Sequence, residues 1–435
     1  MKGNCGMNEY IKVHNDNWNF AYSNSGEIFV PFGTNYFDPE TGWAPKLWIM
    51  FDKKRVQDHF QKMADIGVNT ARIFLTAHSF QPKSDMISKE GIEKLDTMID
   101  IAKSHGIKLI LTGPDHWEGR PDYWGSDKYA GEPALSALEY FWHEVAGRYK
   151  DETVIFAWDL LNEPEVGWKS EAMTEKWRLW LKDKYGTDIA EIPEDRIDKG
   201  NKTLYDYQLF REFIAYEWTR RQVEAIRAVD PNHLVTVGFI QWSFPLLRAP
   251  WGDKANMPSR YAGFNPIKLA DLLDFICIHF YPILGDPGEP ELKAKNTHYL
   301  QAVVNYCYVN KPVVIEEYGW HGGGEMNGKY QPESYQSDWN TNVVKSTLEL
   351  ASGWLVWAYA DTPTSTDLTK FGGLYNINGE LKEWGRSFKS LAEEVTKSEL
   401  NRRKDIKLAD FDEIESLTGD VRNIYDQYLI DSGIK

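Results

Sequence analysis

Residues 154–165 read VIFAWDLLNEPE, an apolar run that ends in Asn162, Glu163 and Pro164. Continuous apolar runs of this length are typical of strands that are buried on both faces of a parallel sheet. Proline lacks a backbone N–H and ends strand pairing, so the run predicts a strand with a carboxylate at its C-terminal tip. In barrels of parallel strands, catalytic residues gather at this end.

Similar runs recur along the chain and alternate with amphipathic helical patterns. The predicted strands cover residues 28–36, 68–75, 107–112, 154–161, 234–239, 274–281, 312–318 and 353–360. The helical patterns cover residues 52–66, 88–105, 134–149, 203–229, 334–350 and 383–396. Eight strands with intervening helices predict an α/β fold, a (β/α)8 TIM barrel. An open doubly wound sheet is the alternative, but the glycine-rich first turn typical of that fold is absent.

Three connections are longer than a bare barrel needs, and all of them follow strands. Residues 165–202, 241–266 and 321–332 extend the βα loops on the face where barrel enzymes build their sites. The first contains a helical stretch, EAMTEKWRLWLKDKYG, at 171–186. We expect residues 1–396 to form the catalytic barrel. The charged segment 397–435, with candidate helices at 411–417 and 421–430, is expected to pack on it as a short helical extension.

Composition narrows the classes of partner. The 435 residues include 49 Lys and Arg against 65 Asp and Glu, a net charge of −16. An acidic surface argues against nucleic acid or an anionic membrane as the main partner. The chain also holds 18 Trp, 23 Tyr and 20 Phe, which suits a cleft that stacks sugar rings. A β-linked oligo- or polysaccharide is therefore the expected ligand.

The sequence also lacks motifs for secretion, membrane insertion and metal binding. Residues 1–10 carry no secretory signal, which predicts a cytoplasmic protein, with secretion as the alternative if a signal peptide has been removed. The apolar runs are too short to span a membrane. Three cysteines without a CxxC pair make neither a disulfide framework nor a zinc site, and the histidines show no HExxH motif. We expect no cofactor and no catalytic metal.

A second strand ends in acidic residues. Residues 311–320 read KPVVIEEYGW, and Glu316 and Glu317 close the apolar run. Burying such side chains is costly unless they are paired or functional. A salt bridge to a helix explains an acidic residue at the end of one strand. Acidic residues at the ends of two strands favour a catalytic pair. Because neighbouring strand residues point to opposite sides, we expect Glu317 to face the barrel mouth and Glu316 to face the helices, paired with a basic group.

The two motifs, in this order and on these strands, resemble clan A glycoside hydrolases, and family 5 most closely. The resemblance covers residues from about 28 to 390. It implies that Glu163 is the general acid/base and that Glu317 is the nucleophile. Two carboxylates about 5 Å apart suit a retaining double displacement.

The resemblance also assigns residues around the pair. It implies that Arg72 keeps the nucleophile ionised, that His279 contacts the substrate or the acid/base, and that Tyr281 donates a hydrogen bond to the nucleophile. A solvated arginine at the barrel rim and a packed core histidine are the structural alternatives. Asn162 is expected to bind the sugar 2-hydroxyl, and Trp357 to form the floor of the sugar site.

Four further residues follow the ends of predicted strands and are expected to shape subsites. They are Tyr36, His116, Trp117 and Trp320. Aromatic packing within loops is the alternative for all of them. The segment GPDHW around His116 departs from the family pattern, which puts the subsite residues in doubt and not the catalytic pair.

The runs FGTNYF, GVNTARIFL, GIKLILT and WDLLNEP look most like the mannan-active members of family 5. A β-mannosidase or β-mannanase is therefore expected. An endo-β-1,4-glucanase or another β-glycosidase of the clan is the alternative, and a carbohydrate-binding barrel without activity is a third reading. The insertion at 165–202 resembles those of exo-acting barrel glycosidases, where extra segments close one end of the cleft, and it favours short oligosaccharides as substrates.

Overall fold

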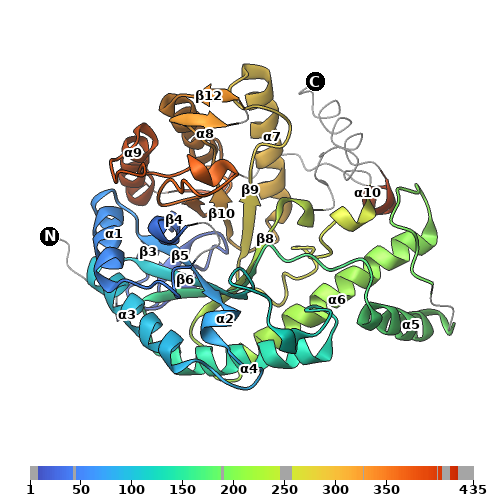
Figure 1. Cartoon of the computed structure of the whole chain (residues 1–435). Helices are drawn as coiled ribbons and strands as arrows, with labels where there is room; N and C mark the ends of the chain where they lie inside the picture. Colours follow the sequence, from blue (N-terminus) through green and yellow to red (C-terminus); the bar gives the residue numbers. More distant parts are fainter. Residues whose placement is uncertain are drawn as a thin grey trace.

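The computed structural model describes residues 8–42, 46–187, 191–244, 257–326, 328–398, 400–403 and 412–419. Eight parallel strands form a closed barrel, and its last strand pairs with its first (Figure 1). In barrel order they are β4 (Phe32–Tyr36), β5 (Thr70–Thr76), β6 (Lys108–Asp115), β7 (Ile155–Asn162), β8 (Leu234–Phe239), β9 (Ile276–Phe280), β10 (Val313–Tyr318) and β13 (Gly353–Val356). The predicted TIM barrel is confirmed.

Helices surround this barrel (Figure 1). They are α1 (Lys53–Asp65), α2 (Ala77–Phe80), α3 (Lys89–His105), α4 (Glu132–Tyr149), α5 (Glu171–Tyr185), α6 (Lys202–Arg227), α7 (Pro290–Cys307), α8 (Glu333–Ser346), α9 (Glu383–Lys397) and α10 (Glu413–Thr418). The sequence patterns did not predict α7. Its buried face includes Asn296 and Asn305 as well as Leu300 and Val303, so the apolar stripe is interrupted. Short 3-10 turns cover Pro39–Thr41, Asp122–Trp124, Gln241–Ser243, Pro258–Arg260 and Leu368–Lys370.

Local sequence fixes several helix ends. Asp52, Ser88, Ser170 and Asn201 accept hydrogen bonds from backbone N–H groups in the first turns of α1, α3, α5 and α6. Such side chains satisfy donors that a helix leaves without partners. Helix α3 ends at Gly106, whose φ of 70° is a left-handed conformation that glycine adopts at low cost. These caps set where the βα loops begin and end.

A small antiparallel sheet closes the bottom of the barrel. It consists of β1 (Ile11–Val13), β2 (Phe20–Tyr22) and β3 (Ile28–Phe29). Phe20 packs edge-on against Phe156 and Phe275, which lie at the N-terminal ends of the barrel strands. The strand predicted at 28–36 is therefore two strands, since Pro31 interrupts the pairing. The opposite end stays available for a site, flanked by the hairpin of β11 (Gly324–Met326) and β12 (Lys329–Gln331).

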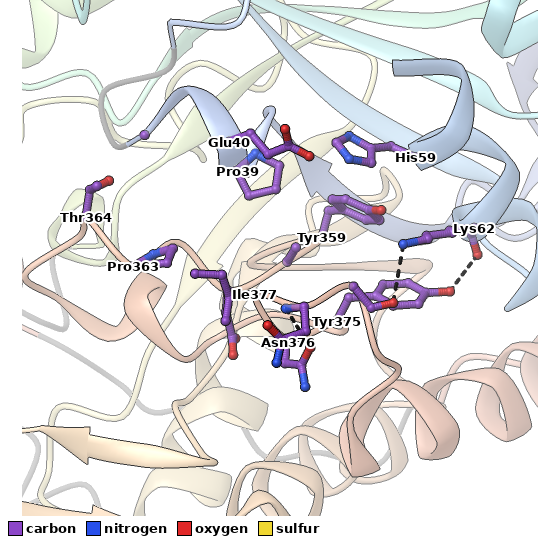
Figure 2. Close-up of a pocket in the computed structure, with 15 residues that line it drawn as sticks. Pro39, Glu40, His59, Lys62, Tyr359, Pro363, Thr364, Tyr375, Asn376 and Ile377 are labelled. Carbon is purple, nitrogen blue, oxygen red and sulfur yellow. Dashed lines mark hydrogen bonds between the residues drawn. The ribbon is translucent and has the colours of Figure 1, made fainter. Parts of the chain in front are cut away.

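Alternation along β4 decides the position of Tyr36. Asn35 points into the barrel, where its side-chain oxygen accepts a hydrogen bond from Arg72 at 3.1 Å. Tyr36 points to the helices, is fully buried, and its hydroxyl lies 3.1 Å from His59 Nδ1 of α1. His59 and Tyr359 line a cavity of about 420 Å³ between α1 and the loop after β13 (Figure 2). Tyr36 thus lies outside the barrel interior, contrary to its expected place in a subsite.

The insertion after β7 places its helix at the periphery of the molecule (Figure 1). Trp177 of α5 packs against Tyr207 and Phe210 of α6, with ring centroids 5.1 and 5.2 Å apart. Helix α5 therefore covers α6 and not the barrel mouth, contrary to the expectation that it closes the cleft. Of this insertion, residues 165–170 closely follow β7, and Glu165, Lys169 and Ser170 line a pocket with residues of the loop after β6.

Helix α10 of the C-terminal extension packs beside α6, whereas Arg402 contacts Asn305 of α7. Glu413 of α10 accepts a hydrogen bond from Lys268 at 2.8 Å, and Leu417 is fully buried. This segment overlaps the candidate helix at 411–417, whereas the candidate at 421–430 lies outside the described residues. The division of the chain at residue 396 stays a prediction.

Two further features bear on the predicted class of protein. Across the described ranges, no helix is both long and apolar enough to cross a membrane. Cys277 and Cys307 are buried free thiols, and Cys5 lies outside the described residues. The cytoplasmic location stays a prediction.

Candidate active site

A β-bulge in β10 turns both of its acidic side chains into the barrel. Between Ile315 and Glu317, two steps along β10 match one step along β9, so Glu316 is an extra residue. Glu316 and Glu317 both contact Arg72, at 3.4 and 2.6 Å. The prediction that Glu316 faces the helices is therefore wrong, because the bulge suspends the alternation on which it rested. Its predicted pairing with a basic group is confirmed.

A second irregularity, in β7, gathers more polar groups at the same place. Between Asp159 and Asn162, three steps along β7 match two along β8. Both side chains reach Arg72 Nη2, Asp159 at 2.7 Å and Asn162 at 3.0 Å. Sequence reasoning missed Asp159, although an acidic residue within an apolar strand is a signal of internal pairing.

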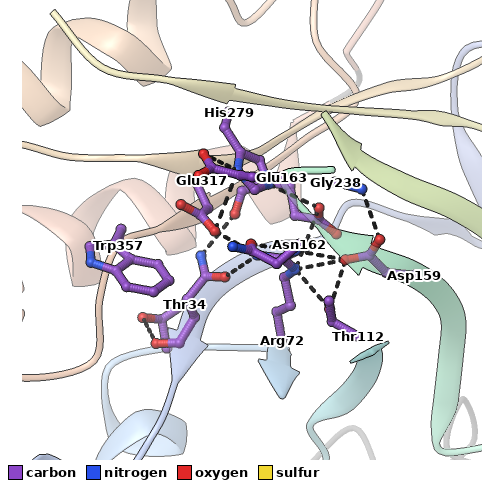
Figure 3. Close-up of polar contacts among 12 residues, drawn as sticks. Thr34, Arg72, Thr112, Asp159, Asn162, Glu163, Gly238, His279, Glu317 and Trp357 are labelled. Atoms are coloured by element: carbon purple, nitrogen blue, oxygen red, sulfur yellow. Dashed lines mark hydrogen bonds and ion pairs between the residues drawn. The ribbon is translucent and has the colours of Figure 1, made fainter. Parts of the chain in front are cut away.

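Arg72 is the centre of this network (Figure 3). Its side chain is fully buried, and the carboxylates around it raise its pKa above the usual value although burial opposes this rise. A guanidinium has donors in a rigid, planar arrangement, so partners on several strands hold it in one orientation. These partners are Asn35 on β4, Thr112 on β6, Asp159 and Asn162 on β7, and Glu316 and Glu317 on β10.

Glu317 accepts hydrogen bonds from two strong donors. Arg72 Nη1 lies 2.6 Å from one carboxylate oxygen, and the Tyr281 hydroxyl lies 2.8 Å from the other. His279 Nδ1 forms an ion pair with the same carboxylate at 3.4 Å. Burial and the charge of Glu163 raise the pKa of Glu317, and these three partners oppose the rise. The predicted contacts of Arg72 and Tyr281 with Glu317 are present.

Glu163 lies at the tip of β7 in a strained backbone conformation. Its φ is 46°, in the left-handed region that residues with a side chain rarely adopt. The backbone N–H donates to Gly238 O at 2.9 Å, and the carboxylate lies 2.9 Å from His279 Nδ1. The Glu163 side chain is 30% exposed, against 5% for Glu317. Of the two carboxylates, that of Glu163 is thus the more accessible to solvent.

The two carboxylates lie close together. One oxygen each from Glu163 and Glu317, with a ring nitrogen of His279, all fall within 4.8 Å of one another. This spacing could also hold a metal ion, and the expectation of a metal-free reaction stays a prediction. Like charges at this distance disfavour double ionisation, so such a pair retains a proton more readily than an isolated acid. The arrangement can supply one acid and one nucleophile.

His279 is held between acidic groups. Burial lowers its pKa, but the charge of Glu317 and the contacts with Glu163 and Glu316 outweigh this and raise the pKa to about 10. The ring is therefore an imidazolium at neutral pH and donates from both nitrogens. Arg72 and His279 in turn hold the pKa of Glu316 below its usual value, although burial acts to raise it.

Gly238 on β8 leaves room for this network. A Cβ atom there would lie 2.6 Å from Arg72 Nη2, 3.0 Å from His279 Nε2 and 3.1 Å from Glu316 Oε2. Its backbone N–H donates to Asp159 at 2.8 Å. Such close approaches leave no space for a larger side chain.

Trp357 lies beside Glu317 (Figure 3) and belongs to a hydrophobic cluster with Phe37, Phe74 and Trp117. The Trp357 indole donates to Thr369 Oγ1 at 2.9 Å. Trp117 stacks on Phe74 with ring centroids 5.3 Å apart, and it meets Trp357 edge-on at 6.4 Å. The structure thus brings the two predicted tryptophans together.

In the described part of the chain, two predicted subsite residues make no direct contact with the catalytic pair, and their place in a subsite stays a prediction. Trp320 is partly buried against the hydrophobic core and lies 5.1 Å from the His321 ring. His116 lines a separate pocket with Lys128. Within the described ranges, neither forms a hydrogen bond or ion pair with Glu163 or Glu317.

Known proteins share this fold and parts of this sequence. The chain is 24% identical over 328 residues to mannan endo-1,4-beta-mannosidase F of Aspergillus clavatus, a match that covers 69% of this chain and 64% of that protein. It is 29% identical over 407 residues to a probable mannan endo-1,4-beta-mannosidase F of Aspergillus flavus, covering 87% and 73%.

Solved structures agree in fold. A GH5_18 protein from Streptomyces cattleya in complex with Manb1-4GlcNAc superposes with a TM-score of 0.65 at 16% identity, over 93% of this chain and 92% of that one. An exo-beta-1,4-mannosidase from Opitutaceae bacterium strain TAV5 gives 0.64 at 16% identity, over 91% and 63%. The family profile Cellulase (glycosyl hydrolase family 5) matches residues 22–362, which contain both acidic strand ends. The chain therefore belongs to glycosyl hydrolase family 5.

Proposed function

We propose that this protein is a retaining β-mannoside hydrolase in which Glu317 is the nucleophile and Glu163 the general acid/base. The observation that carries this proposal is the approach of the two carboxylates to within 4.8 Å. Retaining glycosidases hold their carboxyl groups about 5 to 5.5 Å apart, whereas inverting enzymes leave room for a water between them.

In the first step, the Glu317 carboxylate attacks the anomeric carbon while Glu163 gives its proton to the departing glycosidic oxygen. The glycosidic bond breaks and an ester between the sugar and Glu317 forms. In the second step, Glu163 takes a proton from water, the water oxygen bonds to the anomeric carbon, and Glu317 leaves as a carboxylate. No net charge accumulates over the cycle.

The surrounding groups support these roles. Arg72 and Tyr281 stabilise negative charge on Glu317, which favours its departure in the second step. The Asn162 side-chain oxygen accepts from Arg72, and this orients the amide N–H groups of Asn162 for the sugar 2-hydroxyl. Trp357 provides an apolar face for the ring.

The names of related proteins support mannose as the sugar. Mannan endo-1,4-beta-mannosidases are among the curated relatives, and one structural neighbour holds Manb1-4GlcNAc. The substrate is therefore a β-linked oligo- or polysaccharide. An endo-β-1,4-glucanase is the second candidate, because the matching family profile carries the name Cellulase. A binding barrel without activity is less favoured, since the carboxylate pair and its donors are complete.

Inactivation with a 2-deoxy-2-fluoro-β-mannosyl fluoride tests the mechanism. Peptide mapping should find the label on Glu317, and nuclear magnetic resonance of early products should show the β-anomer. A label on Glu316, an α-anomer, or faster inactivation by the 2-deoxy-2-fluoroglucosyl reagent would each contradict part of the proposal.

The exo action suggested by the insertion is tested with mannan. Helix α5 of the insertion packs on α6, whereas Glu165, Lys169 and Ser170 line the pocket between the loops after β6 and β7. Release of mannose, or almost no attack on the polymer, supports exo action. Early mixed oligosaccharides indicate an endo-mannanase.

A further inference from the structure

A second pocket, of about 220 Å³, lies between the loops that follow β6 and β7. Glu165, two residues after Glu163, forms part of its wall. The two carboxylates are near enough that the charge of Glu163 contributes to the raised pKa of Glu165. A leaving group has to lie beside the acid that protonates it, so this pocket is placed to hold part of one. Its other lining side chains are His116, Arg120, Trp124, Ser126, Asp127, Lys128, Tyr129, Lys169 and Ser170.

Three cations of the pocket form no close ion pair within the described residues, although the charges of Asp115 and Glu165 act on Lys128. In the part of the chain that the structure describes, Arg120, Lys128 and Lys169 have no carboxylate oxygen within 4.0 Å. Among the described residues, Arg120 donates only to a backbone oxygen, that of Gly125, at 2.8 Å. Three unpaired cations around one small pocket are unexpected in a chain with a net charge of −16. They create a local positive potential that favours an anion.

Two of the donors have no strong acceptor. The Trp124 side chain is 1% exposed, and its indole N–H has no hydrogen-bond partner among the described residues. Lys128 Nζ lies 3.5 Å from His116 Nδ1, its one hydrogen-bonding contact in the described ranges. Burial lowers the pKa of His116 to about 4, so this ring is neutral at pH 7. Buried polar groups normally have partners, which makes these donors candidates for contact with a ligand.

The acidic side chains of the pocket do not balance these cations. Both oxygens of Asp127 are engaged, one by the backbone N–H groups of Tyr129 and Ala130 and the other by the Ser170 hydroxyl at 2.6 Å. Burial, with the charge of Glu163, raises the pKa of Glu165 to about 7.

We infer that the pocket binds a carboxylate or phosphate on the leaving group that Glu163 protonates, with Lys128, Trp124 and Arg120 as its donors. This inference rests on the proposed function, because it places the leaving group beside the acid/base. It names a narrower substrate class: β-mannosides whose leaving sugar is a uronic acid or a sugar phosphate.

Three β-1,4-mannosides test the inference, with glucose, glucuronate and glucose 6-phosphate as leaving groups. The wild type should have a kcat/KM for at least one anionic substrate that is about tenfold or more above that for the glucose compound, a typical gain for hydrogen bonds to a charged group. The preferred anion distinguishes carboxylate from phosphate. In Lys128→Met the ratio of anionic to neutral kcat/KM should fall towards one. High salt should also reduce the wild-type ratio, through screening.

The matched control is Lys89→Met, because Lys89 is 91% exposed on α3 and does not line the pocket. It should keep the wild-type ratio. A wild-type ratio of one or less for both anions, or an unchanged ratio in Lys128→Met, overturns the inference. If no β-mannoside reacts, the proposed function fails, and calorimetry then tests the pocket with glucuronate and glucose 6-phosphate. Binding that Lys128→Met weakens at least tenfold sustains the pocket, and absence of binding overturns it.

Discussion

Glu163 and Glu317 differ in the donors that hold them. Glu317 has Arg72 and Tyr281 within 2.8 Å, whereas the carboxylate of Glu163 has, among the described residues, His279 alone at 2.9 Å. Donors stabilise a carboxylate more than a carboxylic acid. These donors oppose the rise in the pKa of Glu317 that burial and the charge of Glu163 cause. The left-handed backbone of Glu163 adds a strain that is typical of functional positions.

Glu163→Ala should separate substrates by their leaving groups. The kcat/KM of β-1,4-mannobiose should fall by about 10² to 10⁴, because its leaving oxygen needs a proton. The kcat/KM of dinitrophenyl β-mannoside should fall much less, because its leaving group departs without a proton. Initial-rate kinetics on both substrates measure this difference, and equal losses would argue against the acid role.

Glu316→Gln should slow the reaction without changing the nucleophile. Glu316 is fully buried and lies 3.4 Å from both Arg72 and His279, so its charge helps to position groups that contact the catalytic pair. We expect kcat to fall about 10- to 100-fold, consistent with a small misplacement of catalytic groups. Azide should restore turnover to Glu317→Gly and not to Glu316→Gly. Rescue of the Glu316 variant would reverse the assignment.

At the scale of elements, two irregular strands and one glycine create the site. The bulge in β10 adds Glu316 to the barrel interior, and the extra residue in β7 brings Asn162 beside Asp159. Strand β8 lies between β7 and β9. Its Gly238 has no side chain, which leaves room for the Arg72 guanidinium. Regular strands would place only alternate side chains inside, so the bulges raise the density of polar groups at the mouth.

Gly238→Ala tests this packing. The added methyl would meet Arg72 at 2.6 Å, and overpacking of this kind costs about 1–3 kcal/mol. We expect a lower free energy of unfolding and a kcat reduced by about 10². Gly147→Ala in α4 is the control, because its Cβ would lie 3.5 Å from Val229, an ordinary contact. Wild-type kcat in Gly238→Ala would contradict the proposed role of close packing.

At the scale of the whole molecule, His279 links the acidic ends of β7 and β10 through β9. Its imidazolium contacts Glu163 at 2.9 Å and Glu316 at 3.4 Å. The pKa is about 10 in the folded protein, against about 6.5 for an unperturbed histidine. A histidine whose pKa is raised in the folded protein contributes its full stabilisation at pH values below its pKa in the unfolded chain. This contribution is lost as the pH rises to the pKa in the folded protein.

Wild-type stability should therefore decline relative to His279→Asn as the pH rises from about 6.5 to 10. Urea unfolding at several pH values gives the difference in the free energy of unfolding between the two proteins. The difference should be largest near pH 6.5 and smallest near pH 10. A difference that does not change with pH would show that His279 is not held as an imidazolium.

The sequence by itself determined the barrel and the acidic strand ends. Buried parallel strands are continuous apolar runs, so VIFAW and KPVVI could be recognised without their neighbours. The short strand motifs also pointed to Arg72 and Tyr281, whose contacts with Glu317 are present. Such features depend on residues that are adjacent or nearly adjacent in the chain.

Only the tertiary structure decided which side chains meet. The alternation of side chains along a strand predicted that Glu316 faces outward. Strand β10 instead has an extra residue in its pairing with both β9 and β13, and this turns the Glu316 side chain inward. The same packing sends Tyr36 to His59 and collects Arg120, Lys128 and Lys169 around one pocket. Register and bulges arise from hydrogen bonding between strands that are far apart in the sequence, so no local pattern encodes them.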